Sequence, residues 1–275
     1  MSVPRVEQYR QIARSRSIPM QTKNLPTITP WYWAAILAAS MCGANTGDFV
    51  AHKLHLGHVI GLLPLAVVFF LILGLERRAK KATEAYYWLA VIVIRTAATN
   101  LGDLLSHDLR FSYSLVLPAL TSLLVLIMVT DKIVSLHSAN GAHTRLSGAY
   151  LPATNWIYWL TLLVAGVLGT AAGDFVASHS GLIYGSAVLG AGYLVVLLAS
   201  MRMRGSEKTW YWVNIVMART AGTTMGDLVA RRLGLSIGTA CTGLLLAGIV
   251  ALSKNMRAEE SSRRATPQSA GPGQR

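Results

Sequence analysis

Residues 87–103 read YWLAVIVIRTAATNLGD, and residues 211–227 read YWVNIVMARTAGTTMGD. In both stretches an Arg lies seven residues after the Trp of a Tyr-Trp pair, and an Asp preceded by Gly lies fifteen residues after that Trp. Each stretch belongs to an apolar segment of about twenty residues, which is long enough to cross a bilayer as a helix. One unit with charged residues at fixed places therefore occurs at least twice.

Two more segments keep the spacing from Tyr-Trp to Gly-Asp without a gap. Trp33 precedes Asp48 by fifteen residues, Trp159 precedes Asp174 by fifteen, and both segments read GDFVA at the Asp in place of the Arg-containing pattern. The two kinds of unit alternate, which indicates a duplicated half. Each unit holds two apolar stretches, so all four units would enter a membrane in the same direction, as parallel repeats do.

The composition is typical of a membrane protein. The chain is 53% hydrophobic and 13% charged, with a mean hydropathy of +0.44, whereas soluble domains are about 25% charged. Helices satisfy their own backbone in lipid, and the apolar stretches lack the alternation of barrel strands. We expect an all-α polytopic membrane protein with eight transmembrane helices. They fall near residues 31–52, 57–75, 86–106, 113–130, 156–177, 182–200, 210–230 and 235–253.

Lys and Arg residues set the expected orientation. The two tails and the loops after the second, fourth and sixth stretches hold nineteen of the 25, and the opposite loops hold four. This bias places both termini in the cytoplasm. Because the net charge of +13 lies mainly in tails and loops, we expect no nucleic-acid partner. We expect a basic cytoplasmic tail at residues 1–30 and a first half of the chain at 31–132. A cytoplasmic linker at 133–155 leads to a second half at 156–253, and a disordered tail follows at 254–275.

The pattern resembles a family of bacterial membrane proteins of unknown function that are built from four tandem repeats. In that family each repeat has two transmembrane helices and a hallmark Trp. The resemblance covers roughly residues 31–254, and it implies the architecture and a bacterial inner membrane while supplying no mechanism. It rests on the four Gly-Asp pairs and on Trp33, Trp88, Trp159 and Trp212.

Polar residues of each unit share one face of its first helix. On a wheel of 100° per residue, the polar side chains that follow Trp88 fall within an arc of about 140°. Small residues four apart flank this arc in every unit, which lets membrane helices approach closely. We therefore expect the first helices of the four units to pack together with their polar arcs inward. The candidate binding residues are Asp48, Asp103, Asp174, Asp227, Arg95, Arg219, Asn45, Asn100, Thr99 and Thr223.

The charges inside the apolar segments carry the functional hypothesis. A charge at the centre of a bilayer costs about 2.5–3.5 kcal/mol, and Arg95 and Arg219 lie about 10 Å past the Trp at 1.5 Å per residue. Four Asp and two Arg leave an excess of two negative charges, which suits a cation or a proton. Two structural alternatives stand beside this one: the Arg residues pair with Asp on a neighbouring helix, or the Asp residues cap helices. The Tyr-Trp pairs are interpreted as aromatic residues of the membrane interface.

Histidines offer a weaker metal signal. His52 and His107 each lie four residues after an Asp, a spacing that places two ligands on one helical face. The second half does not reproduce this pair, which favours solvated loop histidines. The substrate therefore stays open among a divalent metal, a monovalent cation and a proton-coupled organic solute.

We expect an integral membrane transporter or exporter of a small ion, preferably a cation, that uses the repeated Asp residues together with Arg95 and Arg219 and needs no cofactor. The bilayer and a small ion or solute are the expected partners. A membrane scaffold or sensor is the first alternative, although the short loops leave little surface for soluble partners. A membrane enzyme is the second and weaker one, because the sequence has no HExxH, GxSxG or Gly-rich phosphate loop. The carboxylates alone would have to supply acid–base chemistry.

Overall fold

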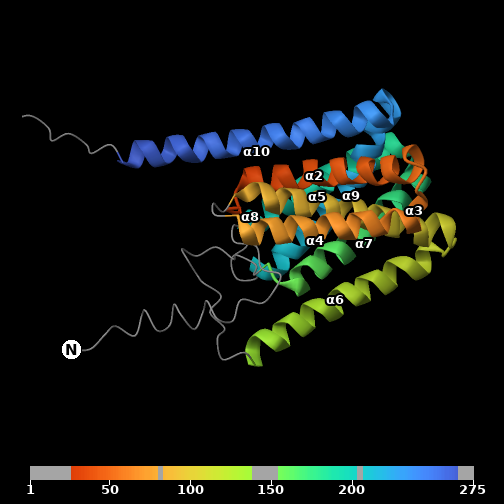
Figure 1. Cartoon of the computed structure of the whole chain (residues 1–275). Coiled ribbons are helices and arrows are strands. Elements are labelled where there is room, and N and C mark those ends of the chain that lie inside the picture. The colour runs from red at the N-terminus through yellow and green to blue at the C-terminus, as the bar shows by residue number, and fades with distance from the viewer. Residues whose placement is uncertain (1–25, 80–82, 138–153, 203–206, 266–275) are drawn as a thin grey trace, which may run out of the picture.

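A computed structural model describes residues 26–79, 83–137, 154–202 and 207–265 of the chain (Figure 1). Every regular element within these ranges is a helix. Four inner helices form the core: α2 (Pro30–Asp48), α5 (Glu84–Asp103), α7 (Trp156–Ser180) and α9 (Glu207–Leu233). Four long outer helices surround them: α4 (Leu62–Arg78), α6 (Tyr113–His137), α8 (Leu182–Arg202) and α10 (Leu235–Ala265). The short elements are η1 (Phe49–Lys53), α3 (Gly57–Ile60) and η2 (Leu104–Asp108).

Glycines close the inner helices into a ring, in the order α2, α5, α7, α9 and back to α2. At each of the four contacts a glycine lies so close to the neighbouring helix that an added Cβ would fall within 2.7 Å of a side-chain atom. The pairs are Gly43 with Arg95, Gly102 with Thr170, Gly169 with Arg219, and Gly222 with Ser40. The predicted close packing of these helices through small residues is confirmed.

Each outer helix packs on the inner helix that follows it in the chain. Thus α4 lies on α5, α6 on α7 and α8 on α9, and α10 closes the series by lying on α2. Figure 1 shows α6 and α10 at opposite edges of the bundle. The outward faces of these helices are apolar and exposed, as at Leu63, Leu115, Val195 and Leu244. They are the surface that a bilayer would cover.

Six helices of the described chain are long and apolar enough to cross a membrane. They comprise the four outer helices together with α5 and α7, counted with the short elements that adjoin them. The other two inner helices, α2 and α9, are not among these six. The helical, membrane-type architecture expected from the sequence is therefore present.

Side-chain caps set where two inner helices begin. The hydroxyl oxygen of Thr29 accepts a hydrogen bond from the backbone N–H of Tyr32 at 3.3 Å, and Pro30 occupies the first turn of α2. At α7, the side-chain oxygen of Asn155 accepts from the N–H of Tyr158 at 2.9 Å. Both caps satisfy backbone donors that a helix start leaves free. They place the two tyrosines in the first turn of their helices.

The predicted disordered tail is wrong in its first part, because α10 continues to Ala265. The segment from Lys254 onward contains Glu, Arg, Met and Ala without Gly or Pro up to Ala265, so good helix formers simply extend the preceding helix. Arg257 in this extension forms a two-pronged ion pair with Glu84 of α5, with N···O distances of 2.6 and 2.8 Å. The predicted basic tail up to residue 25 and most of the linker, residues 138–153, lie outside the described residues.

The outer ends of the inner helices differ between the two halves of the chain. In the first half, the π-helical turns η1 and η2 begin directly after Asp48 and Asp103. In the second half, α7 and α9 stay α-helical past their Asp residues. Each of the latter two then ends at a glycine with positive φ, Gly181 or Gly234. π-helical turns are rare and concentrate at functional sites.

Candidate functional site

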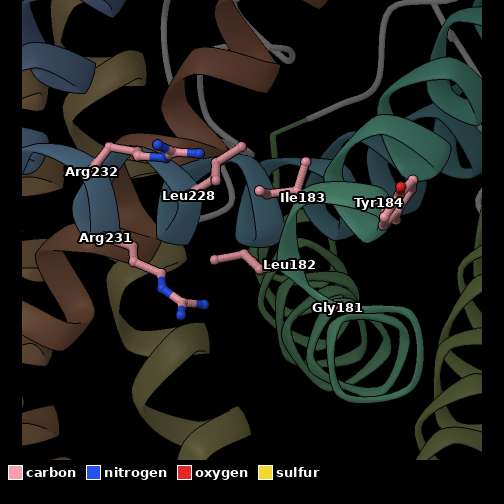
Figure 2. Close-up of a pocket in the computed structure, with 7 residues that line it drawn as sticks. All are labelled: Gly181, Leu182, Ile183, Tyr184, Leu228, Arg231 and Arg232. Atoms are coloured by element: carbon pink, nitrogen blue, oxygen red, sulfur yellow. The ribbon is translucent and has the colours of Figure 1, made fainter.

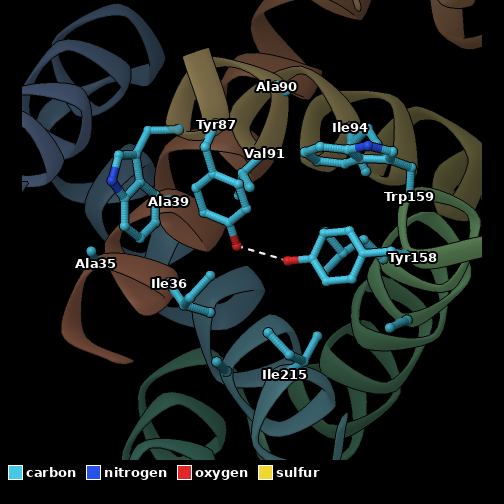
Figure 3. Close-up of a cluster of buried hydrophobic side chains, with 14 of the residues drawn as sticks. Ala35, Ile36, Ala39, Tyr87, Ala90, Val91, Ile94, Tyr158, Trp159 and Ile215 are labelled. Atoms are coloured by element: carbon cyan, nitrogen blue, oxygen red, sulfur yellow. Dashed lines mark hydrogen bonds between the residues drawn. The ribbon is translucent and has the colours of Figure 1, made fainter. Parts of the chain in front are cut away.

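A closed ring of four tyrosine hydroxyls spans one end of the core. Each inner helix supplies one tyrosine, and each hydroxyl is hydrogen-bonded to those of both neighbouring helices. The O···O distances are 2.9 Å for Tyr32–Tyr87, 2.8 Å for Tyr87–Tyr158, 3.0 Å for Tyr158–Tyr211 and 2.7 Å for Tyr211–Tyr32. Figure 3 shows the bond between Tyr87 and Tyr158 among the buried apolar side chains that surround it. The ring closes the core at this level with neutral groups.

The interpretation of the Tyr-Trp pairs as membrane-interface residues is wrong. All four tyrosines are at most 3% exposed, and all four tryptophans are at most 8% exposed. Each Trp packs edge-on against the Tyr that precedes it, as in Trp88 on Tyr87 at 5.2 Å between ring centroids. The rings point inward because the caps and glycine contacts turn that face of each helix toward the core axis. The pairs build the protein interior.

Arg95 lies across the core and is bound by hydroxyls from three helices. Its guanidinium donates to Thr99 at 2.6 Å, to Thr170 at 2.9 Å and to Thr223 at 2.6 Å. The side chain is fully buried. Three neutral acceptors satisfy part of its hydrogen-bonding capacity but leave the positive charge without a bound counter-ion. Thr170, from α7, is an acceptor that the candidate set did not include.

Arg219 occupies the equivalent position of α9 and has a different environment. It is also fully buried, yet none of its three guanidinium nitrogens has a hydrogen-bond partner within the described residues. Its main electrostatic neighbours are the four ring tyrosines. Arg95 interacts electrostatically with Arg219 and, unlike it, with Asp227, Asp103 and Asp174. Arg219 therefore lies on the tyrosine side of the core and Arg95 on the aspartate side.

The hypothesis that the buried arginines pair with aspartates is wrong for the described part of the chain. No nitrogen of Arg95 or Arg219 lies within 4.0 Å of a carboxylate oxygen there. Ion pairs of Lys and Arg among the described residues include Lys208 of α9 with Asp131 of α6, and Arg257 of α10 with Glu84 of α5. Arg95 and Arg219 therefore do not hold the described bundle together through ion pairs with carboxylates.

The four repeated aspartates converge at the end of the core opposite to the tyrosine ring. Asp227 interacts electrostatically with Asp48, Asp103 and Asp174, and also with Arg95. Asp103 is buried at 9% exposure, and the other three are half-buried. A side-chain oxygen of Asp174 is buried without a hydrogen-bond partner in the described chain. The carboxylates therefore share one region instead of facing separate parts of the periphery.

Histidines of the first half stand beside these carboxylates. His107 Nδ1 lies 3.5 Å from Asp103 Oδ1, and ligand atoms of Asp103, His107 and Asp174 all lie within 4.8 Å of one another. His58, on α3, contacts Asp103 and Asp108. His52 is exposed, with its ring centroid 5.6 Å from that of His58. Of the two weak metal candidates, His107 lies among the carboxylates.

Asn45 and Asn100 are fully buried, and neither has a side-chain hydrogen bond within the described residues. Both lie against close helix contacts: Asn45 is near Gly226 of α9, and Asn100 is near Gly47 of α2. Thr99 and Thr223 bind Arg95, as described above. The sequence spacing identified the layer that holds these four residues. It missed the tyrosine ring and His58, whose positions depend on how separate segments meet.

A separate cavity of about 590 Å³ lies where α8 begins and α9 ends. Figure 2 shows Arg231 and Arg232 on α9 beside the start of α8 at Gly181 and Leu182. Its lining is otherwise mainly apolar, with Ile183, Tyr184 and Leu228. No Asp of the converging set lines it. It belongs to the outer surface of the second half.

A family model described as a repeat of unknown function (DUF347) matches residues 31–82 and 210–257. The first match runs over α2 to α4, and the second runs over most of α9 and α10. Each match therefore covers an inner helix and the outer helix that follows it. No curated protein and no solved structure matches the chain. The comparisons support an internally repeated chain with membrane-type helices.

Proposed function

We propose that this protein is a transporter of a small cation in the bacterial inner membrane. The chain then consists of four repeats of an inner and an outer helix, each with its Trp, and crosses the bilayer eight times. The lysine and arginine bias places both termini in the cytoplasm. The tyrosine ring then lies toward the cytoplasm, and the aspartates lie toward the outer face.

The convergence of four aspartates from four helices carries the proposal. Asp48, Asp103, Asp174 and Asp227 act electrostatically on one another, and within the described residues none has a Lys or Arg nitrogen within 4.0 Å. Carboxylates that face each other in a low-dielectric region repel strongly. A bound cation removes this repulsion and supplies the missing counter-charge. Charged residues inside a membrane protein are a functional hypothesis by default.

Arg95 supplies a counter-ion that belongs to the protein itself. Its guanidinium is held only by neutral hydroxyls, and it is within electrostatic range of Asp103, Asp174 and Asp227. The step along α5 from Thr99 to Asp103 is about 6 Å at 1.5 Å per residue. When the cation leaves, a move of the guanidinium by this step pairs it with the emptied carboxylates. Release of the cation is then favourable.

The tyrosine ring is the closed inner barrier in this proposal. Four hydroxyls that are hydrogen-bonded in a ring present no free charge to an ion, and aromatic rings pack around them. A hydrated cation could not pass without separating at least two hydroxyls. Opening the ring and emptying the aspartates would thus be alternate steps of one cycle.

Ion flux in proteoliposomes tests the proposal. Purified full-length protein is reconstituted, and entry of Mn²⁺, Zn²⁺, K⁺ and Na⁺ is followed with trapped indicator dyes. We expect the wild type to move at least one of these cations. The double variant Asp103→Asn, Asp227→Asn should lose most of that flux, because it removes half of the converging carboxylates while keeping side-chain size.

The matched control is Glu259→Gln, which changes an exposed carboxylate on α10. It should transport like the wild type. All variants should elute as one species in size-exclusion chromatography, so that a folding defect is recognised. A wild type that moves none of the four cations would overturn the proposal, as would full flux through the Asn double variant.

A further inference from the structure

His58 is held in one orientation by Asp108. His58 Nδ1 lies 2.8 Å from Asp108 Oδ2, and the His58 side chain is only 10% exposed. An ionised carboxylate only accepts hydrogen bonds, so Nδ1–H donates to Asp108. In the neutral ring the lone pair then belongs to Nε2.

That lone pair points into the aspartate region. His58 Nε2 lies 3.9 Å from Asp103 Oδ2, and it is buried without a hydrogen-bond partner among the described residues. This distance is too long for a hydrogen bond. Two electron-rich atoms therefore face each other across a gap, which is unfavourable unless a cation lies between them.

Two further ligands surround the same carboxylate. The other oxygen of Asp103 lies 3.5 Å from His107 Nδ1, and a ligand atom of Asp174 lies within 4.8 Å of both residues. The four residues His58, Asp103, His107 and Asp174 are called the mouth site below. They come from α3, α5, η2 and α7, so three segments of the first half and one of the second meet here.

We propose that the mouth site binds a divalent transition-metal ion, and that this class of ion is the transported cation. The second clause rests on the proposed function, whereas binding does not. Two imidazole nitrogens and two carboxylates suit Mn²⁺, Fe²⁺, Co²⁺ or Zn²⁺. Mg²⁺ and Ca²⁺ prefer ligand sets made of oxygen alone. Two carboxylates also neutralise the two charges of the ion.

Metal binding requires the site to contract, because ligand atoms of Asp103, His107 and Asp174 lie within 4.8 Å of one another and His58 lies outside that group. Ligands 2.0–2.2 Å from one tetrahedral metal ion lie about 3.4 Å apart, and the contacts of Asp103 with His58 and His107 are 3.9 and 3.5 Å. Asp108 would then orient the His58 ring, as carboxylates commonly do for metal-binding histidines. The π-helical turn η2 carries both His107 and Asp108.

Metal titration of the purified full-length protein tests binding without any transport. The protein carries no polyhistidine tag and is titrated in detergent with Zn²⁺ and Mn²⁺ by calorimetry, with Mg²⁺ as the reference ion. We expect one saturable site per chain for Zn²⁺ and none of comparable affinity for Mg²⁺. The visible spectrum of bound Co²⁺ should report nitrogen and oxygen ligands.

Matched variants locate the site. His58→Ala, His58→Gln and Asp103→Asn should each lower the Zn²⁺ affinity by about tenfold or more, and Asp108→Ala by about 10–100-fold. His55→Ala is the control, because His55 is an exposed histidine three residues away in the same loop. Each His58 variant should also change the Co²⁺ spectrum, which a general loosening of the loop would not do. Wild-type affinity in both His58 variants, or an equal loss in the control, would overturn the mouth site.

Flux measurements with the same variants separate the two proposals. If Zn²⁺ and Mn²⁺ bind at the mouth site but the protein moves no cation, the transport function is wrong and the site stands. If the protein moves K⁺ or Na⁺ but neither Zn²⁺ nor Mn²⁺, transport stands and the assigned substrate class is wrong. Metal flux that is equal in the wild type and in His58→Ala overturns the role of the site in transport.

Discussion

The two halves of the chain agree at one end of the core and differ at the other. At the tyrosine end, Tyr32 and Tyr87 from the first half meet Tyr158 and Tyr211 from the second in one ring of similar bonds. At the aspartate end, only the first half has π-helical turns and a group of histidines. The tyrosine end, to which all four inner helices contribute equally, is symmetric. The aspartate end, where the short elements η1, α3 and η2 lie, is one-sided in the described chain.

The buried arginines show the same difference inside the core. Arg95 binds Thr170, which lies eleven residues after Trp159 in the third unit. The equivalent position after Trp33 is Ala44. The first unit therefore lacks the hydroxyl that corresponds to Thr170, and Arg95 already uses Thr99 and Thr223. Equivalent positions in a duplicated chain do not have equivalent partners.

The largest effect is expected from large side chains at the glycine contacts between inner helices. Substitutions in both halves test whether these contacts are equally tight. Gly43→Leu and Gly169→Leu should both prevent folding, because an added Cβ would lie 2.4 or 2.5 Å from an arginine side chain. We expect a loss of at least about 3 kcal/mol in each half. The yield of monodisperse protein in size-exclusion chromatography measures it.

Each half offers its own control for this test. A Cβ at Gly74 of α4 or at Gly248 of α10 meets no atom within 4 Å among the described residues, so Leu at either position should be tolerated. A folded Gly169→Leu variant beside an unfolded Gly43→Leu variant would show that the contacts of the two halves are not equivalent.

Replacement of the two arginines should have opposite effects on thermal stability. Arg95→Leu loses three hydrogen bonds from a charged group, so we expect a loss of about 1.5–3 kcal/mol. Arg219→Leu removes a buried charge without a hydrogen-bond partner in the described chain, and we expect a gain of about 1 kcal/mol or more. Thermal unfolding in detergent, followed by circular dichroism, distinguishes the signs. Equal losses would mean that Arg219 is as well satisfied as Arg95.

Removal of one hydroxyl from the tyrosine ring should affect both halves equally. Tyr87→Phe and Tyr211→Phe each break two hydrogen bonds, so both should lower the unfolding free energy by about 1–2 kcal/mol. Tyr184→Phe is the control, because Tyr184 is 74% exposed. Chemical denaturation of the three variants makes the comparison. A clear difference between the first two would show that the ring does not follow the duplication.

The smallest expected effect comes from a substitution that offers Arg219 a hydroxyl like the one that Thr170 offers Arg95. Ala44→Ser places a hydroxyl at the position equivalent to Thr170 and should stabilise the protein by about 0.5–1 kcal/mol through Arg219. The same substitution in an Arg219→Leu background should bring no gain, so the two variants form a double-mutant cycle. A gain of the same size in both backgrounds would contradict this explanation.

Much of the fold could be predicted from the sequence, because the spacing from Trp to Asp fixes which faces of four helices are polar and small. The inner packing and the shared location of the aspartates follow from that spacing. The direction of the tyrosines did not follow, since an aromatic residue near a helix start suits a membrane interface and a buried ring equally well. The hydrogen bonds of Arg95 to three hydroxyls depend on distances between helices, and a helical wheel of one helix does not give these distances. His58 depends on the path of a short loop.

Each outer helix packs on the inner helix of the next unit, and this arrangement has a consequence for biosynthesis. Because α10 lies on α2, the last of the described helices to be synthesised covers the first of them. The ring of inner helices can close only when α9 has followed α7, and α2 gains its outer helix only when α10 has followed α9. The described bundle is therefore complete only after α10 has been added. A fragment that ends before α10 would leave that side of α2, including Cys42 beside Gly243, uncovered.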